Sequence, residues 1–290
     1  MYTIDCVIVT FNPNINTLQS LVISLLGQVR NIYIIDNSSD CKYNIEVPEN
    51  VRIIRLVRNY GIAYAQNYGI LISLSYYSDF ILISDQDTIY PKNYVKDMIS
   101  LFSIFDKTAG VSPVFVDSKS NVTFPSYYMT KYRFKKFYPY NGIYEVSQTI
   151  SSGLIINSKY LPDIGLMNED FFIDWVDTEW CWRAIKKGYK VLLNSNVKIY
   201  HNFGDRYLNL FNKNITIRNH IRHYYITRNA FYLSLYCKHI SIYHRIYLFI
   251  FSFKYIFGYP ILSKNHLLNL RFVLLGFIHG LFKRMGSLSN

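Results

Sequence analysis

Two aspartates stand close together at the end of an apolar segment, in the order Asp85-Gln86-Asp87. The preceding residues, Phe80–Ser84, are mostly apolar, which predicts a buried strand that ends at these carboxylates. Carboxylates spaced i, i+2 on a tight turn can offer oxygens to one hard divalent cation and leave its other positions to phosphates and water. Short acidic turns are frequent on protein surfaces, but the position at a strand end makes this one a candidate site for Mg²⁺ or Mn²⁺.

A third ligand for such a cation is available at His201, which follows the strand predicted over Lys190–Tyr200. A lone histidine after a strand is more often a surface or capping residue. The cation needs more protein donors than two carboxylates, however, and a neutral imidazole beside oxygen ligands suits Mn²⁺ as well as Mg²⁺. We therefore predict a metal site of Asp85, Asp87 and His201.

The densest group of chemically active residues is Asn168–Arg183, where five carboxylates alternate with Phe and Trp. Acids near the start of a helix offset its dipole, so a helix N-terminus around Asp174 and Asp177 explains part of the pattern. That explanation leaves out the aromatic side chains. Aromatic faces beside carboxylates suit a sugar site, which needs apolar platforms and a base for a hydroxyl. Apolar surroundings would also raise the pKa of a carboxyl there, as general-base catalysis prefers.

These residues need a scaffold, and strand-like and helix-like segments alternate along the first part of the chain. Strands are predicted over 3–11, 31–36, 51–57 and 80–84, with helices over 17–27 and 62–75. Such alternation with short connections predicts a parallel, doubly wound α/β sheet. Ligands bind beyond the carboxyl ends of the strands in these sheets. The polar residues at those ends are Thr10, Asn12, Asp36, Asn37, Arg58, Asn59, Asp85 and Asp87.

The middle of the chain is less regular. We expect a helix from Pro91 to Phe105, a strand at Gly110–Val116 and a strand-like segment at Gln148–Asn157. The Tyr- and Lys-rich stretch Asp117–Tyr144 has no clean period, so we interpret it as a loop or an acceptor-side insertion.

The chain after residue 205 is basic, aromatic and helical in pattern. It contains no Asp or Glu, and the whole chain of 290 residues has a net charge of +12. Ile242–Phe257, which Gly258 and Pro260 would end, and Leu267–Leu281 resemble apolar-faced helices with basic residues near their ends. This composition suits an anionic membrane surface, and protein packing or a homodimer interface is the alternative. The predicted division is a catalytic domain, 1–205, and a basic helical region, 206–290, for membrane or oligomer contact.

Composition also argues against several classes of protein. Half of the residues are hydrophobic and 17% are charged, which excludes a disordered chain. Four scattered cysteines without a CxxC pair predict a reducing compartment and no zinc site. We expect no secretory signal, and no apolar run reaches the roughly 18–20 residues of a spanning helix. No RNA-binding signature accompanies the basic residues, so nucleic acid is a poor candidate partner. The expected location is cytoplasmic, peripheral on the inner face of the plasma membrane.

Five segments together resemble the inverting family 2 glycosyltransferases with the GT-A fold, a Rossmann-like, mostly parallel sheet. The last of them is most similar to the rhamnosyltransferase branch, with the galactofuranosyltransferases close behind. Their order and spacing over about residues 3–205 make the resemblance specific. One departure is Gln86 in place of an acid between the two aspartates, and we expect its side chain to point away from the cation. The segments are VIVTFNP (Val7–Pro13), IDNSSD (Ile35–Asp40), RNYGIAYAQNYGI (Arg58–Ile70), SDQD (Ser84–Asp87) and FFIDWVDTEWCWRA (Phe171–Ala184).

The resemblance implies a role for each candidate residue on the donor side. The cation held by Asp85, Asp87 and His201 would neutralise the leaving nucleoside diphosphate. The remaining residues of the nucleotide-sugar site would be Thr10, Asn12 and Asp36 around the base and ribose, and Asn59, Gly61 and Asn67 on the diphosphate side.

On the acceptor side, the resemblance makes Asp177 the catalytic base that deprotonates the attacking hydroxyl. Asp174 lies close enough in the sequence to compete for that role. Trp175, Glu179 and Trp180 would contact the acceptor.

The implied reaction moves L-rhamnose from dTDP-L-rhamnose to a glycan or polyprenyl-linked acceptor, as in the biosynthesis of surface polysaccharides such as O-antigen. A cation is most useful there as negative charge grows on the leaving group. A galactofuranosyl- or other hexosyltransferase of the same fold is one alternative. The alternative from another class is a non-catalytic basic protein that binds lipid or nucleic acid, but such a protein has no use for the acidic centre.

Overall fold

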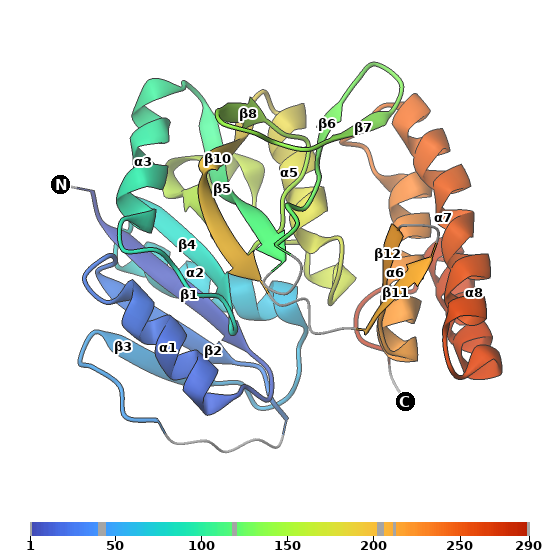
Figure 1. Cartoon of the computed structure of the whole chain (residues 1–290), viewed down its shortest axis with the longest axis horizontal. Coiled ribbons are helices and arrows are strands. Elements are labelled where there is room, and N and C mark those ends of the chain that lie inside the picture. Colours follow the sequence, from blue (N-terminus) through green and yellow to red (C-terminus); the bar gives the residue numbers. More distant parts are fainter. Residues whose placement is uncertain (1, 40–44, 118–120, 202–205, 211–212, 289–290) are drawn as a thin grey trace.

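An eight-stranded sheet forms the centre of the computed structural model, which describes residues 2–39, 45–117, 121–201, 206–210 and 213–288 (Figure 1). For residues 201, 206–210 and 213–217 the description covers the backbone alone. The strand order is β3-β2-β1-β4-β9-β5-β10-β8, and β6–β7 and β11–β12 form separate two-stranded ladders. The strands are β1 (Ile4–Thr10), β2 (Asn31–Asp36), β3 (Val51–Arg55), β4 (Phe80–Asp85), β5 (Thr108–Asp117), β6 (Ser126–Met129), β7 (Phe134–Phe137), β8 (Ile143–Glu145), β9 (Leu154–Asn157), β10 (Lys190–His201), β11 (Arg206–Leu210) and β12 (Lys213–Ile217). The helices are α1 (Ile15–Leu25), α2 (Ile62–Ser75), α3 (Tyr94–Ile104), α4 (Leu161–Ile164), α5 (Val176–Lys186), α6 (His220–Tyr236), α7 (Ile242–Leu262) and α8 (His266–Leu281), with 3-10 turns η1 (Ser158–Tyr160) and η2 (Glu169–Phe171).

The first four strands bring their carboxyl ends to one edge of the sheet, as the sequence predicts. β1 lies between β2 and β4 and runs parallel to both. Thr10 at the end of β1 pairs with Asp36 at the end of β2, and Val9 pairs with Asp85 at the end of β4. The polar residues at these strand ends are therefore neighbours in space.

Alternate side chains of the strands are buried on opposite faces of the sheet, and helices cover both faces. In β1, Cys6 and Ile8 pack in one core with α1 and α3, whereas Val7 and Val9 pack in another with α2 and α5. Burial on both faces explains why these strands are continuous apolar runs. Gly69 allows α2 to approach β1 closely, because a Cβ atom there would lie 2.3 Å from Cγ1 of Val7.

One strand in the middle of the sheet runs against its neighbours. β9 is antiparallel to both β4 and β5, and Leu154 lies opposite Ile83 of β4. The predicted strand Gln148–Asn157 is too long, because β9 begins only at Leu154. β9 begins beside the carboxyl end of β4, so Ser151 and Ser152 join the polar edge that the parallel strands form.

The segment Asp117–Tyr144 was predicted as a loop or an acceptor-side insertion, and its described residues contain β6, β7 and the start of β8. β6 and β7 form a hairpin, and β8 lies antiparallel to β10 at the edge of the sheet. Phe134 of the hairpin stacks on Trp182 of α5 at 5.1 Å, and Tyr132 meets Tyr243 of α7 at 5.1 Å. The hairpin therefore contacts both the sheet domain and the C-terminal helices.

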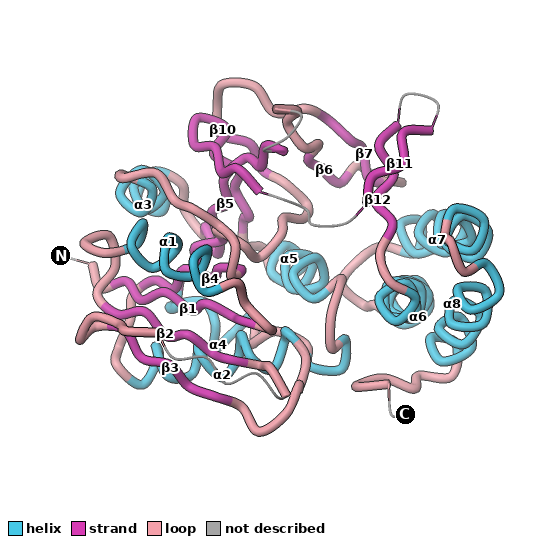
Figure 2. The backbone as a smooth tube through the Cα atoms, turned by 60° about the horizontal axis from the view of Figure 1, so that its bottom comes forward, coloured by secondary structure: helices cyan, strands magenta, loops and turns pink. Residues whose placement is uncertain are grey.

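The chain ends in three packed helices, with α6 between α5 and the pair α7–α8 (Figure 2). The β11–β12 ladder precedes them, although the sequence predicted no strand beyond residue 205. α8 packs closely on α6 at two glycines. A Cβ atom at Gly276 would lie 2.5 Å from the carbonyl oxygen of Tyr224, and one at Gly280 would lie 2.6 Å from that of Arg228.

Helix α7 is longer than the predicted Ile242–Phe257, because it continues through Gly258 and Pro260 to Leu262. A proline in the last turn removes few hydrogen bonds, and packing along the buried side of the helix outweighs the low helix propensity of both residues. By length and composition alone, α7 is long and apolar enough to cross a membrane. The prediction that no segment reaches that length is therefore wrong for α7.

Candidate active site

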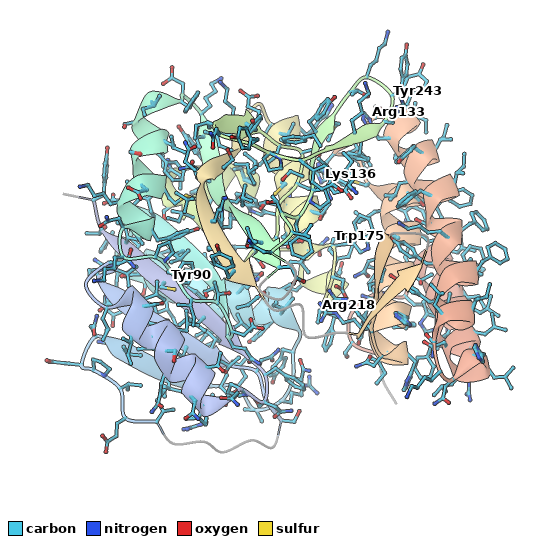
Figure 3. The ribbon with its side chains drawn as sticks, in the orientation of Figure 1. Tyr90, Arg133, Lys136, Trp175, Arg218 and Tyr243 are labelled. Atoms are coloured by element: carbon cyan, nitrogen blue, oxygen red, sulfur yellow. The ribbon has the colours of Figure 1, made fainter. Side chains whose placement is uncertain are left out.

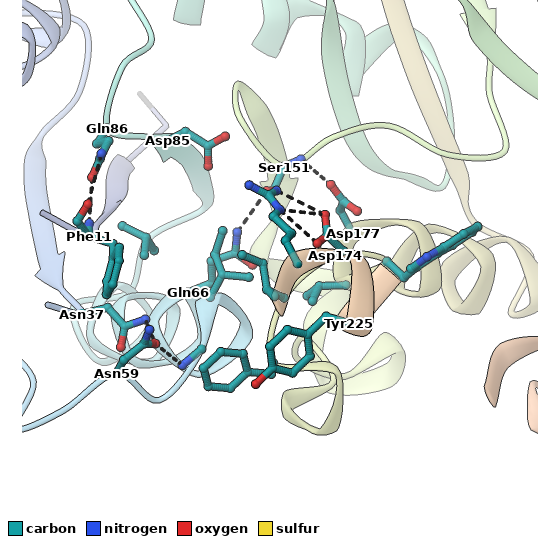
Figure 4. A pocket seen from close by; sticks show the side chains of 18 of the residues that line it. Phe11, Asn37, Asn59, Gln66, Asp85, Gln86, Ser151, Asp174, Asp177 and Tyr225 are labelled. Atoms are coloured by element: carbon teal, nitrogen blue, oxygen red, sulfur yellow. Dashed lines mark hydrogen bonds and ion pairs between the residues drawn. The ribbon is translucent and has the colours of Figure 1, made fainter. Parts of the chain in front are cut away.

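A cleft of about 770 Å³ opens at the carboxyl edge of the sheet, between the ends of β1, β2 and β4 and the start of α6 (Figure 4). The cleft draws on both predicted regions, 1–205 and 206–290. The described residues that line it are Val9, Thr10, Phe11, Asn37, Asn59, Gly61, Ile62, Gln66, Asp85, Gln86, Asp87, Ile150, Ser151, Phe172, Ile173, Asp174, Trp175, Val176, Asp177, Arg218, Asn219, Ile221, Arg222 and Tyr225.

The edge formed by β1 and β2 is built around the buried carboxylate of Asp36. The hydroxyl of Thr10 donates to Oδ1 of Asp36 at 3.1 Å, and the hydroxyl of Ser38 donates to the same oxygen at 2.6 Å. The Ser38 oxygen in turn accepts the backbone N–H of Asn12 at 2.8 Å. Of the three residues predicted here, Thr10 lines the cleft, whereas Asp36 lies behind it and Asn12 is outside the described lining. Asp36 therefore positions the cleft edge.

The turn after β3 brings Asn59 and Gly61 into the cleft. The side-chain amide of Asn37 donates to Oδ1 of Asn59 at 3.0 Å, and the backbone N–H of Gly61 donates to the same oxygen at 2.9 Å. Gly61 has a φ of 90°, and a Cβ atom there would lie 2.6 Å from the carbonyl oxygen of Phe172. Glycine is required at position 61 both for its positive φ angle and for the close approach of the backbone at Phe172.

Asp85 and Asp87 both line the cleft, as predicted. The side chain of Gln86 bonds the backbone of Phe11, accepting its N–H at 2.7 Å and donating to its carbonyl oxygen at 3.3 Å (Figure 4). Gln86 thus ties the turn Asp85–Asp87 to the end of β1. The backbone N–H of Asp85 donates to the hydroxyl of Ser152 at 3.2 Å, which anchors the turn from the β9 side.

The proposed third metal ligand, His201, is the last residue of β10, and its side chain lies outside the described residues. Among the side chains that the structure does describe, no group of three or more His, Cys, Asp or Glu is placed to hold a metal ion. Two carboxylates at one strand end fit a cation that also takes oxygens from a phosphate-bearing ligand.

Asp177, in the first turn of α5, lies half-buried in the cleft wall. Its Oδ2 accepts the backbone N–H of Ser151 at 3.0 Å, and its Oδ1 accepts that of Thr178 at 2.8 Å. Burial raises the pKa of Asp177 to about 6, and the negative charges of Asp85 and Asp174 add to the shift against the opposing effect of the two N–H groups. A carboxyl group with this pKa is ionised at pH 7 and more basic than an ordinary aspartate, which suits a general base.

Asp174 is in a different electrostatic environment, because Arg222 of α6 pairs with it. Nε of Arg222 lies 3.0 Å from Oδ2 of Asp174, and Nη2 lies 3.2 Å from Oδ1. This two-pronged ion pair occupies both oxygens of the Asp174 carboxylate. The geometry therefore favours Asp177 over Asp174 as the proton acceptor.

The turn that carries Asp174 has an unusual backbone, since Phe172, Asp174 and Trp175 have φ angles of 64°, 62° and 66°. Such angles are unfavourable for residues other than glycine and persist where the surroundings enforce them. Two fully buried residues of α6, Arg228 and Asn229, supply that support. Their hydrogen bonds to the turn run from Nη2 of Arg228 to the carbonyl oxygens of Asp170 and Phe171 at 3.1 and 2.8 Å, and from Nδ2 of Asn229 to those of Phe171, Ile173 and Asp174 at 3.1, 2.9 and 2.9 Å.

The wall opposite the strand edge is aromatic and basic. Phe172 stacks on Tyr225 of α6 with ring centroids 4.9 Å apart, and the indole N–H of Trp175 donates to the carbonyl oxygen of Ile226 at 3.2 Å. Trp175 and Arg218 lie between the sheet domain and the C-terminal helices (Figure 3). The cleft therefore combines a carboxylate edge with apolar ring faces and arginines.

Comparison with known proteins decides the family. The family model described as glycosyl transferase family 2 matches residues 5–161, more than half of the chain. A dTDP-rhamnosyl transferase, RfbF of Shigella flexneri, is 34% identical over 235 residues, which is 79% of this chain and 79% of RfbF. The chain belongs to glycosyl transferase family 2. It is a glycosyltransferase of the rhamnosyltransferase-like branch, as the motifs predict, and the hypothesis of a non-catalytic basic binding protein is excluded.

Solved structures show that the glycosyltransferase has the GT-A fold. TarS of S. aureus, residues 1–349 in complex with UDP-GlcNAc, has a TM-score of 0.60 at 14% identity, covering 97% of this chain and 82% of that 1–349 chain. The mannosyltransferase PcManGT from Pyrobaculum calidifontis, in complex with GDP-Man and Mn²⁺, has a TM-score of 0.56 at 8% identity, covering 98% and 89%. The predicted fold class, a mostly parallel α/β sheet with C-terminal helices, is confirmed.

Besides Asn12 and Asp36, three further predicted site residues of the glycosyltransferase lie outside the described lining of the cleft and make structural contacts. Asn67 of α2 is buried and bonds the backbone of Met167 in both directions, at 2.8 and 2.9 Å. Glu179 is buried in an ion pair with Arg183 at 3.0 Å. Trp180 is fully buried and donates to the carbonyl oxygen of Gly165 at 3.0 Å. The α5 residues Val176 and Asp177 line the cleft at the start of the helix. Glu179 and Trp180 follow one turn further along α5, where they are buried in the core.

Several residues of the site were not predicted from the sequence. Ser151 lies in the segment predicted as strand-like, which gives no indication that its N–H bonds Asp177. The cleft residues of α6, including Arg222 and Tyr225, fall in the predicted basic helical region, 206–290, as do Arg228 and Asn229. An Arg-Asn pair followed directly by the apolar and aromatic run Ala230–Leu233 is the signal that could have indicated a buried polar contact.

Proposed function

We propose that this glycosyltransferase transfers L-rhamnose from dTDP-L-rhamnose, with inversion, to a hydroxyl group of a glycan or polyprenyl-linked acceptor. The similarity to RfbF carries the choice of donor, because it extends over 79% of both chains. The alignment with RfbF covers 235 residues, whereas the family model matches 157 residues that end at position 161. The similarity to RfbF therefore also includes parts of the chain beyond the donor side.

In the proposed mechanism, Asp177 removes the proton from the acceptor hydroxyl as its oxygen attacks the anomeric carbon of rhamnose. A new C–O bond forms on one face of the sugar while the bond to the diphosphate oxygen breaks on the other, so the configuration inverts. The two backbone N–H groups on Asp177 fix the direction of its carboxylate. The raised pKa of about 6 makes proton transfer to Asp177 more favourable than to an ordinary aspartate.

The donor side is assigned to the strand edge. Thr10 and Asn37 present polar groups for the nucleoside, and Asn59 and Gly61 line the diphosphate side. Asp85 and Asp87, together with His201, are proposed to hold Mg²⁺ or Mn²⁺. The cation would supply positive charge to the departing diphosphate. Mn²⁺ accompanies GDP-Man in PcManGT, which shares the fold.

The acceptor side is assigned to the aromatic wall. Phe172 and Trp175 offer ring faces to the C–H faces of an acceptor sugar, and the buried ring of Tyr225 supports Phe172 by stacking on it. Asp174 and Arg222 lie at the same wall and can bond acceptor hydroxyls at the edge of their ion pair.

A donor panel tests this assignment. The full-length protein with Mn²⁺ is offered dTDP-L-rhamnose, UDP-galactofuranose, UDP-GlcNAc and GDP-mannose, and release of each nucleotide is measured. We expect release from dTDP-L-rhamnose to exceed the others by about tenfold or more. A preference for any other donor would overturn the rhamnosyl assignment and leave the family unaffected.

A further inference from the structure

The two last helices expose apolar side chains along the side that faces away from α6. On α7, Ile246, Ile250, Phe257 and Ile261 are spaced by four, seven and four residues, which places them on one side of the helix, and each is more than half exposed. On α8, Leu274 and Ile278 are 40% and 46% exposed. We call these six residues the outer face.

The opposite side of each helix is the packed one. Leu248 and Ile256 of α7 and Val273 of α8 are buried, and Phe231 of α6 forms a small core with Ile256 and Val273. Gly276 of α8 lies against the α6 backbone. The outer face is therefore not needed to hold the three helices together.

The charge around the outer face has one sign. Lys254, Lys264 and Arg271 are exposed on or between the two helices, and Lys283 follows α8. The sequence contains no Asp or Glu after Asp205. A large apolar surface bordered only by cations indicates a partner that is apolar within and anionic at its edge.

A second copy of the chain fits this surface poorly. A two-fold dimer would place two copies of the outer face against each other and bring the cations Lys254, Lys264 and Arg271 of both copies together, with no carboxylate on either face to pair with them. A bilayer leaflet with anionic headgroups satisfies both the apolar side chains and the cations.

Helix α7 has the length to cross a bilayer, but the side opposite the outer face packs against other parts of the protein. Nε of Arg245 donates to the carbonyl oxygen of Ser234 in α6 at 3.0 Å, and His244 is buried beside Phe134 of the β6–β7 hairpin. Crossing would separate these contacts, whereas lying in the interface keeps them and buries the outer face.

We propose that the outer face of α7 and α8 docks on an anionic lipid leaflet, with both helices lying in the interface. The proposal stands on exposure and charge and does not depend on the identity of the donor. Because α6 contacts α8 on one side and lines the cleft with Arg222 and Tyr225 on the other, docking holds the cleft beside the membrane. This location suits an acceptor whose carrier is a membrane lipid.

The test is flotation of the full-length protein with phosphatidylcholine vesicles, with or without phosphatidylglycerol. We expect binding to the anionic vesicles alone, partly reversed by salt. The double variant Ile250→Ser/Phe257→Ser should bind about tenfold more weakly or worse, because it removes two large apolar side chains from the interface. The triple variant Lys254→Gln/Lys264→Gln/Arg271→Gln should lose the preference for anionic lipid.

The matched controls are Leu71→Ser/Ile104→Ser and Lys92→Gln/Lys107→Gln, which alter exposed residues elsewhere on the molecule. The controls should bind like the unchanged protein, and thermal shift with dTDP should show that every variant remains folded. Equal binding by the outer-face and control variants, or no binding to either vesicle, would overturn the proposal. So would resistance to an alkaline carbonate wash, which indicates a crossing helix, or a dimer in solution that Ile250→Ser/Phe257→Ser dissociates.

Discussion

The side-chain amide of Asn229 donates to the carbonyl oxygen of Asp174 at 2.9 Å. This hydrogen bond joins the C-terminal helices to the acidic turn, residues 170–175, that precedes α5. Asp174 has a φ of 62°, an angle that an aspartate rarely adopts without support. The turn leads directly into α5, whose first turn carries Asp177. Helix α6 therefore fixes the backbone that presents both carboxylates to the cleft.

We expect Asn229→Leu to lower kcat by about ten- to a hundredfold while changing the KM for the donor little, because it lets the acidic turn relax away from the donor-binding strand edge. The control is Leu21→Ala, which removes core packing under the far face of the sheet. Steady-state kinetics well below both melting temperatures make the comparison. If Leu21→Ala lowers kcat as much as Asn229→Leu does, the effect is general destabilisation and Asn229 has no positioning role.

Asp177→Asn should keep donor affinity and lower transfer by roughly 10²–10⁴-fold, the usual contribution of a general base. The substitution retains the shape of the side chain and an oxygen for one backbone N–H group. Asp174→Asn should have a smaller effect on kcat, since Arg222 already occupies that carboxylate. Near-normal turnover by Asp177→Asn together with an inactive Asp174→Asn would reverse the assignment.

The activity should depend on pH through Asp177. Its raised pKa of about 6 means that the carboxylate becomes protonated as the pH falls through that value, and a protonated carboxyl cannot accept the acceptor's proton. We expect kcat/KM to fall about tenfold per pH unit below the pKa. A profile that stays flat down to the pKa of an ordinary aspartate would show that burial does not tune this group.

Asp87→Ala should abolish the increase in dTDP affinity that Mn²⁺ produces while leaving the fold intact, because Asp87 follows the strand end and lines the cleft. Thermal shift with dTDP, in the presence and absence of Mn²⁺, measures this. Asp97→Ala, an exposed acid in the first turn of α3, is the control and should behave like the unchanged protein. Metal-stimulated binding that survives in Asp87→Ala would remove this residue from the metal site.

The sequence predicted the parts of the molecule in which local pattern and tertiary environment agree. Continuous apolar strands ending in polar residues place Thr10 and Asp85 correctly, because parallel register brings such ends together. The pattern could not show that β9 runs antiparallel, since a short buried strand has the same composition in either direction. It also could not separate Asp177 from Glu179, because only the orientation of α5 decides which acid faces the cleft.

The contribution of α6 was beyond sequence reasoning for a different reason. Arg228 and Asn229 act on residues more than fifty positions earlier in the chain, and their buried bonds to the acidic turn exist only after the helices pack. The basic character of residues 206–290 suggested a separate function for that whole region. Its first helix instead belongs to the site, and the exposed faces of the later two carry the charge pattern that the sequence emphasised.

The central claim, inverting rhamnosyl transfer with Asp177 as base, is tested most directly by the stereochemistry of turnover. Time-resolved NMR of dTDP-L-rhamnose with the full-length protein and Mn²⁺ reports the anomeric configuration of the first sugar product, with water or an added glycan as acceptor. The account predicts a product of opposite anomeric configuration to the donor and a rate at least about a hundredfold lower in Asp177→Asn. Retention of configuration, or an undiminished rate in Asp177→Asn, would contradict it.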